Sequence, residues 1–239
     1  MLASRTFVFA LLSAAACAHL PAIAAVSPAI TTAVADPARP AADKERDARR
    51  KPAELLAFAG IKPGSKVADL FPGGGYFTRI FSTVVGPSGH VYALSPREDA
   101  TLKAFAATRP NITYSVEPLD KVQLAEPLDF FWTSLNYHDV LNRNGTVALN
   151  ALVFRSLKPG GVYIVIDHSA ANDAPADVSS TLHRIRRDTV TEQVKAAGFE
   201  LVEDSALLAN PDDPRTAGVR DPSVQGRTDQ FVLKFRKPG

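Results

Sequence analysis

Three histidines lie at positions where an enzyme could use them for chemistry. His138 in NYHD and His168 in IDHS each follow an apolar run, and His183 lies in TLHRI just before a predicted helix. Neutral imidazole near pH 7 can take a proton from a hydroxyl or an amine. We therefore predict His138 as a general base, with Asp167 and His168 as supporting catalytic residues.

The same side chains allow a second interpretation as metal ligands. Together with Asp139 and Asp167, the histidines offer the imidazole and carboxylate groups that bind divalent metals. No close spacing such as H-E-x-x-H is present in the sequence. The prediction is therefore that no metal is bound, and a metal-assisted enzyme that uses His138, His168 and His183 stays as an alternative.

A run of three glycines, Gly73 to Gly75, follows the short apolar segment that contains Asp69. Glycine permits a positive φ and a close approach to the backbone, and the next helix offers free N–H groups. This pattern predicts a turn that holds a nucleotide-type cofactor. Binding of NAD is disfavoured, because the fingerprint G-x-G-x-x-G would need glycine where the chain has Thr78.

Apolar and helical segments alternate along the chain from residue 43 onward. This alternation predicts a mostly parallel α/β sheet covered by helices on both faces. Segment 128–135 is apolar, so we expect a strand buried on both faces, with Phe131 and Trp132 in the core. Strands are expected within residues 62–71, 90–95, 112–118, 128–135, 162–167, 199–208 and 229–235, and helices within 43–60, 78–86, 98–108, 145–157 and 189–198.

Local signals predict where some of these helices begin and end. Thr189 and Glu192 match the S/T-x-x-E capping box, which places a helix start at Thr189. Gly60 and Gly198 stand where glycine commonly ends a helix. Ligands of such sheets bind beyond the carboxyl ends of the strands, near the point where the strand order reverses. The segments expected there are 71–75, 95–99, 136–139 and 167–169.

The stretch from Asp69 to Gly75 resembles the D-x-G-x-G-x-G turn of class I S-adenosylmethionine-dependent methyltransferases. LKPGGVYIVIDH is similar to the turn and fifth strand of that family, and VKAAGFELV with the strand after it is similar to its carboxyl end. RDARRKPAELLAFAG, NYHD, IDHSA, HRI and GRTDQFVLKF together resemble a group of exported, predicted bacterial methyltransferases. The resemblance covers residues 46–238.

The resemblance implies a Rossmann-like, seven-stranded, mostly parallel sheet with helices on both faces and an antiparallel last strand. It also implies S-adenosylmethionine as the cofactor, and methyl transfer to an oxygen or nitrogen of a small-molecule acceptor. The residues that it places at the cofactor are Asp69, Gly73, Gly74, Gly75, Ser95 and Asn136.

Two positions depart from the pattern of that family. Phe71 occupies the first glycine position of the turn, and Ser95 stands where an acid normally binds the ribose hydroxyls. An exported ligand-binding protein without catalytic activity would show such departures on the same fold. That protein is the alternative function.

Residues 209–229 have no periodicity and separate the last two predicted strands. Loops of this length in compact domains are commonly functional. Arg215 and Arg227 in this loop predict a lid that recognises a carboxylate or phosphate of the substrate, with a solvated loop or a dimer contact as the alternative. Tyr137 and His183 are also predicted to contact the substrate.

The first residues have the order of a secretory signal peptide. Arg5 precedes an apolar stretch that ends in small residues suited to cleavage. We predict residues 1–24 as a signal peptide, 25–42 as an Ala/Pro-rich linker and 43–239 as the methyltransferase-like domain. The protein would then be exported to the periplasm, and lipid attachment at Cys17, the only cysteine, is the alternative.

The 27 basic and 25 acidic residues give a formal net charge of +2. Proteins that bind nucleic acid usually carry a basic patch or stripe, so this balance gives no reason to expect a nucleic-acid partner. Without lipid at Cys17, no stable membrane association is expected. We predict a monomer or a homodimer that binds a small-molecule acceptor.

Overall fold

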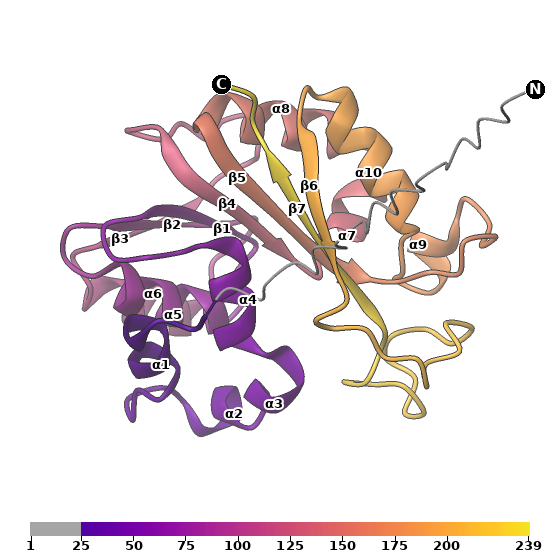
Figure 1. The fold of residues 1–239 in the computed structure, drawn as a ribbon, viewed down its shortest axis with the longest axis horizontal. Helices are drawn as coiled ribbons and strands as arrows, with labels where there is room; N and C mark the ends of the chain where they lie inside the picture. Colours follow the sequence, from indigo (N-terminus) through magenta and orange to yellow (C-terminus); the bar gives the residue numbers. More distant parts are fainter. Residues whose placement is uncertain (1–24) are drawn as a thin grey trace, which may run out of the picture.

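The computed structural model describes residues 25–239, which form a seven-stranded sheet in the order β3-β2-β1-β4-β5-β7-β6 (Figure 1). The strands are β1 (Lys66–Leu70), β2 (His90–Ser95), β3 (Ile112–Val116), β4 (Leu128–Ser134), β5 (Leu157–His168), β6 (Glu200–Ser205) and β7 (Gln230–Arg236). Strands β1 to β5 pair in parallel, and β7 runs antiparallel between β5 and β6. The predicted α/β architecture with an antiparallel last strand is confirmed.

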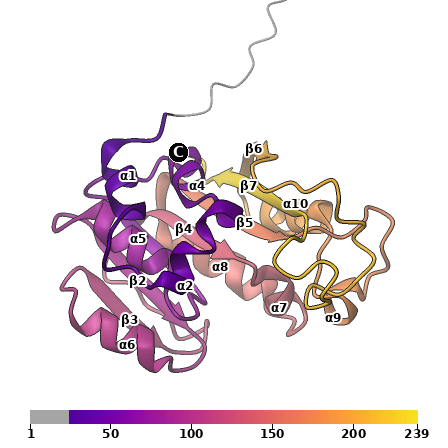
Figure 2. The ribbon, with the colours of Figure 1, turned by 90° about the horizontal axis from the view of Figure 1, so that it is seen from below.

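Helices cover both faces of the sheet (Figures 1 and 2). Those on one face are α1 (Pro28–Val34), α4 (Pro52–Ala59), α5 (Tyr76–Val85) and α6 (Ala100–Ala107). Those on the other are α7 (Tyr137–Leu141), α8 (Thr146–Ser156) and α10 (Arg187–Ala196). The short helices α2 (Ala41–Lys44), α3 (Asp47–Arg50) and α9 (Val178–Thr181) lie at the end of the sheet where the parallel strands finish.

Strand β4 shows how the two faces share one core. Phe131 and Trp132 are both fully buried, but successive side chains of a strand point to opposite faces. Trp132 therefore packs with the helices of one face, where its ring centroid lies 4.8 Å from Phe77 and 5.3 Å from Phe81. Phe131 packs with Tyr163 on the other face. The prediction that both are core residues is confirmed.

Residues 25–42, predicted as a linker, contain a helix that belongs to the folded body. The Ser27 side chain accepts a hydrogen bond at the start of α1, and Pro28 supplies a preset backbone angle in its first turn. Ile30 and Ala33 lie one turn apart and are buried in the core with α4 and α5. A helix of two turns is too short to give a clear periodic signal, which explains the difference.

The single helix predicted over 43–60 is three helices. Lys51 adopts a φ of +42°, and Pro52 then begins α4. The residue before proline is disfavoured in the helical region, and proline itself has no N–H to donate. Gly60 ends α4 with a φ of +88°, as predicted.

Helix α10 begins at Arg187, so Thr189 lies inside its first turn and the predicted capping box is wrong. Gly198 follows the helix with a φ of +99°, in agreement with the predicted stop. Among residues 25–239, no helix has both the length and the apolar content needed to cross a membrane. The predicted signal peptide and Cys17 lie outside the described residues.

Candidate functional site

The turn after β1 is held by left-handed backbone. Phe71, Gly73 and Gly75 have φ values of +52°, +54° and +87°. The N–H of Gly75 donates to the carbonyl of Pro72 at 3.0 Å, which closes the turn. A Cβ on Gly75 would lie 2.7 Å from Leu102 Cδ1, whereas a Cβ on Gly73 or Gly74 would meet no atom within 4 Å. Gly75 therefore packs against the protein, and the other two glycines face open space.

A cavity of about 240 Å³, here called the glycine-turn cavity, lies between this turn and the end of β4. It is at the switch point of the sheet, because β2 and β4 pair with opposite edges of β1. The predicted cofactor residues that line it are Asp69, Gly73, Gly74 and Asn136. Gly75 and Ser95 do not line it.

Asp69 is a buried carboxylate at the floor of the glycine-turn cavity. Its Oδ2 accepts a hydrogen bond from Thr78 Oγ1 at 2.6 Å. Burial raises the pKa of Asp69 to about 7, against the opposing effect of this hydrogen bond and of the nearby positive charge of Arg50. A cationic group in the cavity would favour the ionised carboxylate.

Asn136 joins the ends of two strands. Its side-chain amide donates to the carbonyl of Leu70 at 3.1 Å and to that of Ser134 at 2.8 Å. These carbonyls end β1 and β4, and a carbonyl at a strand end has no partner in the ladder. Asn136 thus fixes the width of the cavity in addition to lining it.

Arg50, which sequence reasoning missed, enters the glycine-turn cavity from α3. Its guanidinium carbon lies 4.3 Å from the Tyr76 ring centroid and 4.7 Å from that of Phe77, and Nη2 donates to Ser134 Oγ at 3.1 Å. Burial lowers the pKa of Arg50 to about 10, so it stays charged at neutral pH. The sequence signal was the run RDARRKP, whose three arginines were treated only as part of a charged helix.

A second cavity of about 520 Å³, here called the arginine-lined cavity, adjoins the first. The two cavities share Arg46, Arg50 and Leu135. Segments 46–51 and 208–212 face each other across it, and Figure 2 looks toward this end of the sheet from below. The cationic side chains that line it are Arg46, Arg49, Arg50, Lys51 and Arg227.

A third cavity of about 340 Å³, here called the Ser95 cavity, lies on the β2 side of the turn. It shares Phe71, Gly73 and Asn136 with the glycine-turn cavity. Ser95 Oγ donates to the carbonyl of Arg97 at 2.5 Å, so its proton is already used. Phe71, at the position of the missing glycine, forms a wall common to both spaces.

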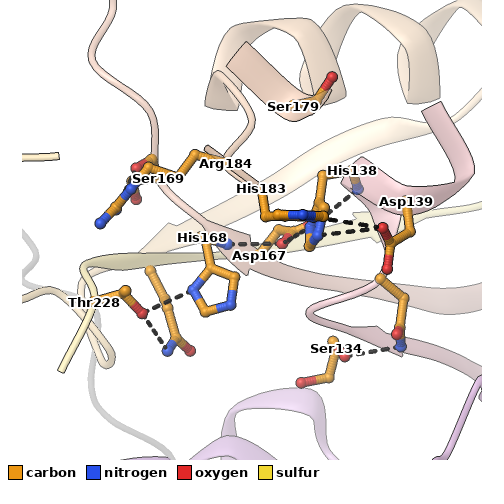
Figure 3. A network of polar contacts seen from close by, with 12 residues as sticks. Ser134, His138, Asp139, Asp167, His168, Ser169, Ser179, His183, Arg184 and Thr228 are labelled. Carbon is orange, nitrogen blue, oxygen red and sulfur yellow. Dashed lines mark hydrogen bonds and ion pairs between the residues drawn. The ribbon is translucent and has the colours of Figure 1, made fainter. Parts of the chain in front are cut away.

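His138 and Asp167 form a buried pair. Asp167 is fully buried, and its carboxylate accepts from His138 Nδ1, from His138 N and from His168 N, each at 2.8 Å (Figure 3). Burial opposes a positive charge on His138, but the hydrogen bond and negative charge of Asp167 outweigh it and raise the pKa of His138 above its usual value. His138 lines none of the three cavities.

His168 is turned away from this pair. Its Nδ1 lies 2.7 Å from Thr228 Oγ1, and both residues line the arginine-lined cavity. Its ring centroid is 6.0 Å from that of His138. Burial lowers the pKa of His168 to about 4, so the ring is neutral at pH 7. The histidine that reaches a cavity is therefore His168, which the sequence predicted only as a supporting residue.

His183 is the third histidine that the sequence predicted at this site, after His138 and His168. Its ring centroid lies 5.6 Å from that of His138, and its φ is +54°, in the left-handed region. Asp139 Oδ1 is 3.7 Å from His138 Nε2 and 3.8 Å from His183 Nδ1. In Figure 3 both rings point toward Asp139. We call His138, Asp139 and His183 the histidine cluster.

Tyr137 does not contact a substrate space, which corrects the prediction. Its side chain is fully buried in the core against α8 and α10. The hydroxyl accepts from Asn150 Nδ2 at 2.8 Å and donates to Gln193 Oε1 at 3.1 Å. Tyr137 lines none of the cavities described above.

The loop between β6 and β7 is held by a buried ion pair. Arg184 is fully buried and pairs with Asp213 at 2.8 Å and 3.1 Å, an arrangement that the sequence did not indicate. Arg215 pairs with Asp229 at 2.9 Å and lines a separate cavity, so it does not join Arg227 at the arginine-lined cavity. Only one of the two predicted loop arginines thus reaches that space.

Comparison with known proteins agrees with this architecture. The fold is similar to a SAM-dependent methyltransferase from Aquifex aeolicus, with a TM-score of 0.60 and 18% identity over 83% of this chain and 98% of that one. It is also similar to 1,6-didemethyltoxoflavin-N1-methyltransferase from Burkholderia thailandensis, solved with S-adenosylhomocysteine, with a TM-score of 0.56 and 18% identity over 83% and 79% of the two chains. These similarities show a Rossmann-like methyltransferase fold.

Sequence comparison gives a narrower match. No family model matches the chain. The chain is 29% identical over 127 residues to ubiquinone/menaquinone biosynthesis C-methyltransferase UbiE from Ectopseudomonas mendocina. The match covers 48% of this chain and 46% of that protein, so it spans about half the length of the relative.

Proposed function

We propose that the protein transfers a methyl group from S-adenosylmethionine to an oxygen or nitrogen of a small anionic molecule. The observation that carries this proposal is the pair of adjoining cavities, which share Arg46, Arg50 and Leu135 as walls. Methyl transfer depends mainly on holding donor and acceptor next to each other in the right orientation. Two spaces with a common wall suit that requirement. The fold and the UbiE relative, a C-methyltransferase, support methyl transfer in general and do not specify the acceptor atom.

The residues at the glycine turn fit the cofactor. Gly73 and Gly74 leave open space beside the backbone, which lets a ligand approach more closely than any side chain would allow. Asp69 offers a carboxylate to the amino group of the cofactor, and Arg50 offers a guanidinium to its carboxylate. When bound, S-adenosylmethionine supplies an electrophilic methyl group.

The Ser95 cavity would take the nucleoside part of the cofactor. It continues from the glycine-turn cavity past Phe71, Gly73 and Asn136. Ser95 can only accept a hydrogen bond there, because its proton is donated to Arg97. Three acids also line this cavity: Glu98, Asp99 and Asp139. Asp99 already accepts from Leu102 N at 2.9 Å, so we assign the ribose hydroxyls to Glu98, whose pairing with Lys103 is on the surface.

The charge of the arginine-lined cavity indicates the class of acceptor. Five cationic side chains line it against the single carboxylate of Asp212, among the described residues. Guanidinium groups bind carboxylate and phosphate through paired hydrogen bonds. An acceptor with one of these groups would be held beside the transferred methyl.

We assign the base to His168 rather than to His138. His168 lines the arginine-lined cavity and is held by Thr228, whereas His138 is paired with buried Asp167. A neutral imidazole can accept the proton that leaves the acceptor. A low pKa makes it a weak base, which is sufficient where alignment carries most of the rate.

Calorimetric titration with S-adenosylhomocysteine tests the cofactor, and two matched glycine variants test its place. Neither Gly74 nor Gly218 has a positive φ, and each has room for a side chain. Gly74→Val should abolish binding because its side chain enters the glycine-turn cavity, while Gly218→Val should bind as the unmodified protein does. Equal binding by both variants would contradict the proposed cofactor site. If the unmodified protein does not bind at all, the non-catalytic ligand-binding alternative is favoured.

Export to the periplasm is also a proposal, based on the order of residues 1–24. Its test is the mass of the protein recovered from a periplasmic extract. A mass that begins at residue 25 supports cleavage of a signal peptide, and a lipid-modified mass beginning at Cys17 supports the lipoprotein alternative. Recovery only from the cytosol at full mass contradicts export.

A further inference from the structure

We propose that the histidine cluster is a binding site for a divalent transition metal, with His138 Nε2, His183 Nδ1 and Asp139 Oδ1 as the ligands. This site borders the Ser95 cavity through Asp139, but it shares no residue with the glycine-turn cavity or the arginine-lined cavity. It would stand even if the protein did not bind S-adenosylmethionine, because no ligand atom in it belongs to the glycine turn. The site is smaller than the sequence alternative, which also offered His168 and Asp167 as ligands.

The positions of the three atoms carry the argument. Asp139 Oδ1 lies 3.7 Å from His138 Nε2 and 3.8 Å from His183 Nδ1, and all three ligand atoms lie within 4.8 Å of one another. These separations are too long for hydrogen bonds between the groups. Bond lengths of about 2.1 Å at tetrahedral or octahedral angles place ligand atoms about 3.0 to 3.4 Å apart. The two pairs that contain Asp139 need a closure of well under 1 Å, and the two imidazole nitrogens, which lie within 4.8 Å of each other, must also approach to enclose a metal.

The hydrogen bonds of His138 prepare it to be a ligand. Its Nδ1 lies 2.8 Å from Asp167, whose carboxylate also accepts from two backbone N–H groups, so we place the proton of this hydrogen bond on Nδ1. The other ring nitrogen, Nε2, then presents its lone pair toward Asp139. A carboxylate behind a metal-binding histidine fixes the ring and its tautomer in many metal sites. Asp167 is itself held by two backbone N–H groups, so this support is rigid.

The backbone of His183 points to the same use. Its φ of +54° is uncommon for a residue other than glycine, and it turns the ring toward His138 and Asp139. Such strained positions occur often at functional sites. The side chains of His183 and Asp139 are about 37% and 43% exposed, so a metal ion can reach them from solvent.

The ligand set favours one class of metal. Two imidazoles and one carboxylate suit zinc, iron, cobalt, nickel and copper better than magnesium or calcium, which prefer oxygen ligands. Three protein ligands also leave positions open for water or another molecule. Asp139 lines the Ser95 cavity as well, so a metal held by it would border that space.

The test is titration of the purified, metal-free protein with Zn²⁺ by calorimetry, and with Co²⁺ by visible absorption, which reports the coordination geometry. We expect one ion bound per chain and no comparable binding of Mg²⁺. Asp139→Asn and His183→Asn should each weaken binding at least tenfold. Asparagine tolerates the left-handed backbone at position 183. Circular dichroism and thermal unfolding would show that both variants keep the fold.

Two further variants separate this site from other histidines. His90 lies at the start of β2, away from the carboxyl edge, and is held by Thr113. His90→Gln and His168→Gln should bind Zn²⁺ as the unmodified protein does. The proposal is overturned if neither Zn²⁺ nor Co²⁺ binds, or if binding survives both Asp139→Asn and His183→Asn. Asp167→Asn should weaken binding about 10- to 100-fold if it folds, as expected for a group that orients a ligand.

Discussion

The glycine turn and the histidine cluster stand at the same edge of the sheet, but they are built in opposite ways. At the turn, Gly73 and Gly74 have no side chains and face open space. At the cluster, the side chains are large, and His138 is fixed by buried Asp167. The first region leaves open space beside the backbone of Gly73 and Gly74, where a ligand can bind. In the second region, the hydrogen bond to Asp167 holds the ring of His138 in one orientation.

The two regions should therefore respond differently to mutation, one in ligand binding and the other in stability. Added volume should affect ligand binding at the turn without affecting stability, provided that the glycine faces the cavity. Removal of Asp167, the buried carboxylate that orients His138 of the cluster, should affect stability first, because the N–H groups bound to it lose their acceptor.

The first prediction concerns Asp167. Asp167→Ala should lower the free energy of unfolding by about 3 kcal/mol or more, because it leaves two buried N–H donors of His138 and a partly buried one of His168 without an acceptor. Urea denaturation measures the loss. The exposed Asp188 is the control, and Asp188→Ala should change stability by less than about 0.5 kcal/mol. Similar losses in both variants would mean that Asp167 is not what holds the cluster.

The second prediction compares two glycines of the turn, Gly75 and Gly74. Gly75→Val should destabilise the fold by about 1 to 3 kcal/mol, because its Cβ meets Leu102 and its φ is +87°. Gly74→Val should cost less than about 0.5 kcal/mol, since nothing lies in its way. Thermal unfolding of the two variants gives the comparison. If Gly74→Val proved the more destabilising, the turn would face the protein rather than a ligand.

The third prediction is a pH dependence that belongs to the turn. Burial raises the pKa of Asp69 to about 7, so the carboxylate becomes protonated and loses its charge as the pH falls through that value. Affinity for the ammonium group of S-adenosylhomocysteine should therefore fall by up to about tenfold per pH unit below pH 7. Calorimetry between pH 5 and pH 8 measures it. The profile should become flat in Asp69→Asn, and a slope that persists there would assign it to another group.

The fourth prediction concerns the residue that joins the cluster to the core. Tyr137→Phe removes the hydroxyl shared by Asn150 and Gln193, and should cost about 1 kcal/mol of stability. Binding of S-adenosylhomocysteine should not change, because the ring is fully buried away from the cavities. A reduced affinity for S-adenosylhomocysteine with unchanged stability would indicate that Tyr137 contacts the ligand.

The sheet could be predicted from the sequence because its signals are local. The apolar run in β4 and the glycine triplet after β1 each indicate their own structure and position. The glycines could not be told apart, since Gly75 packs against Leu102, which lies in α6 beyond the next strand of the chain. The histidines were brought together correctly, but their directions were not predictable. Those directions come from Asp167 and Thr228, hydrogen-bond partners on β5 and just before β7.

The sequence also did not predict that the amino-terminal segment lines the glycine-turn cavity, and the reason is related. Arg50 reaches the glycine-turn cavity only because Lys51 breaks the helix and turns α3 toward β4. A pattern of charges cannot show that turn. Likewise, Arg184 and Asp213 are far apart in the chain, so neither suggested a buried pair.

The docking of α1 also limits how far the domain can move from its amino-terminal end. A free linker over residues 25–42 would span up to about 60 Å when fully extended. Because the folded body already begins at Pro28, the chain between Cys17 and that body can extend no more than about 40 Å. If lipid were attached at Cys17, the domain would stay within roughly one molecular diameter of the membrane. It would then have to bind its substrate close to the membrane surface.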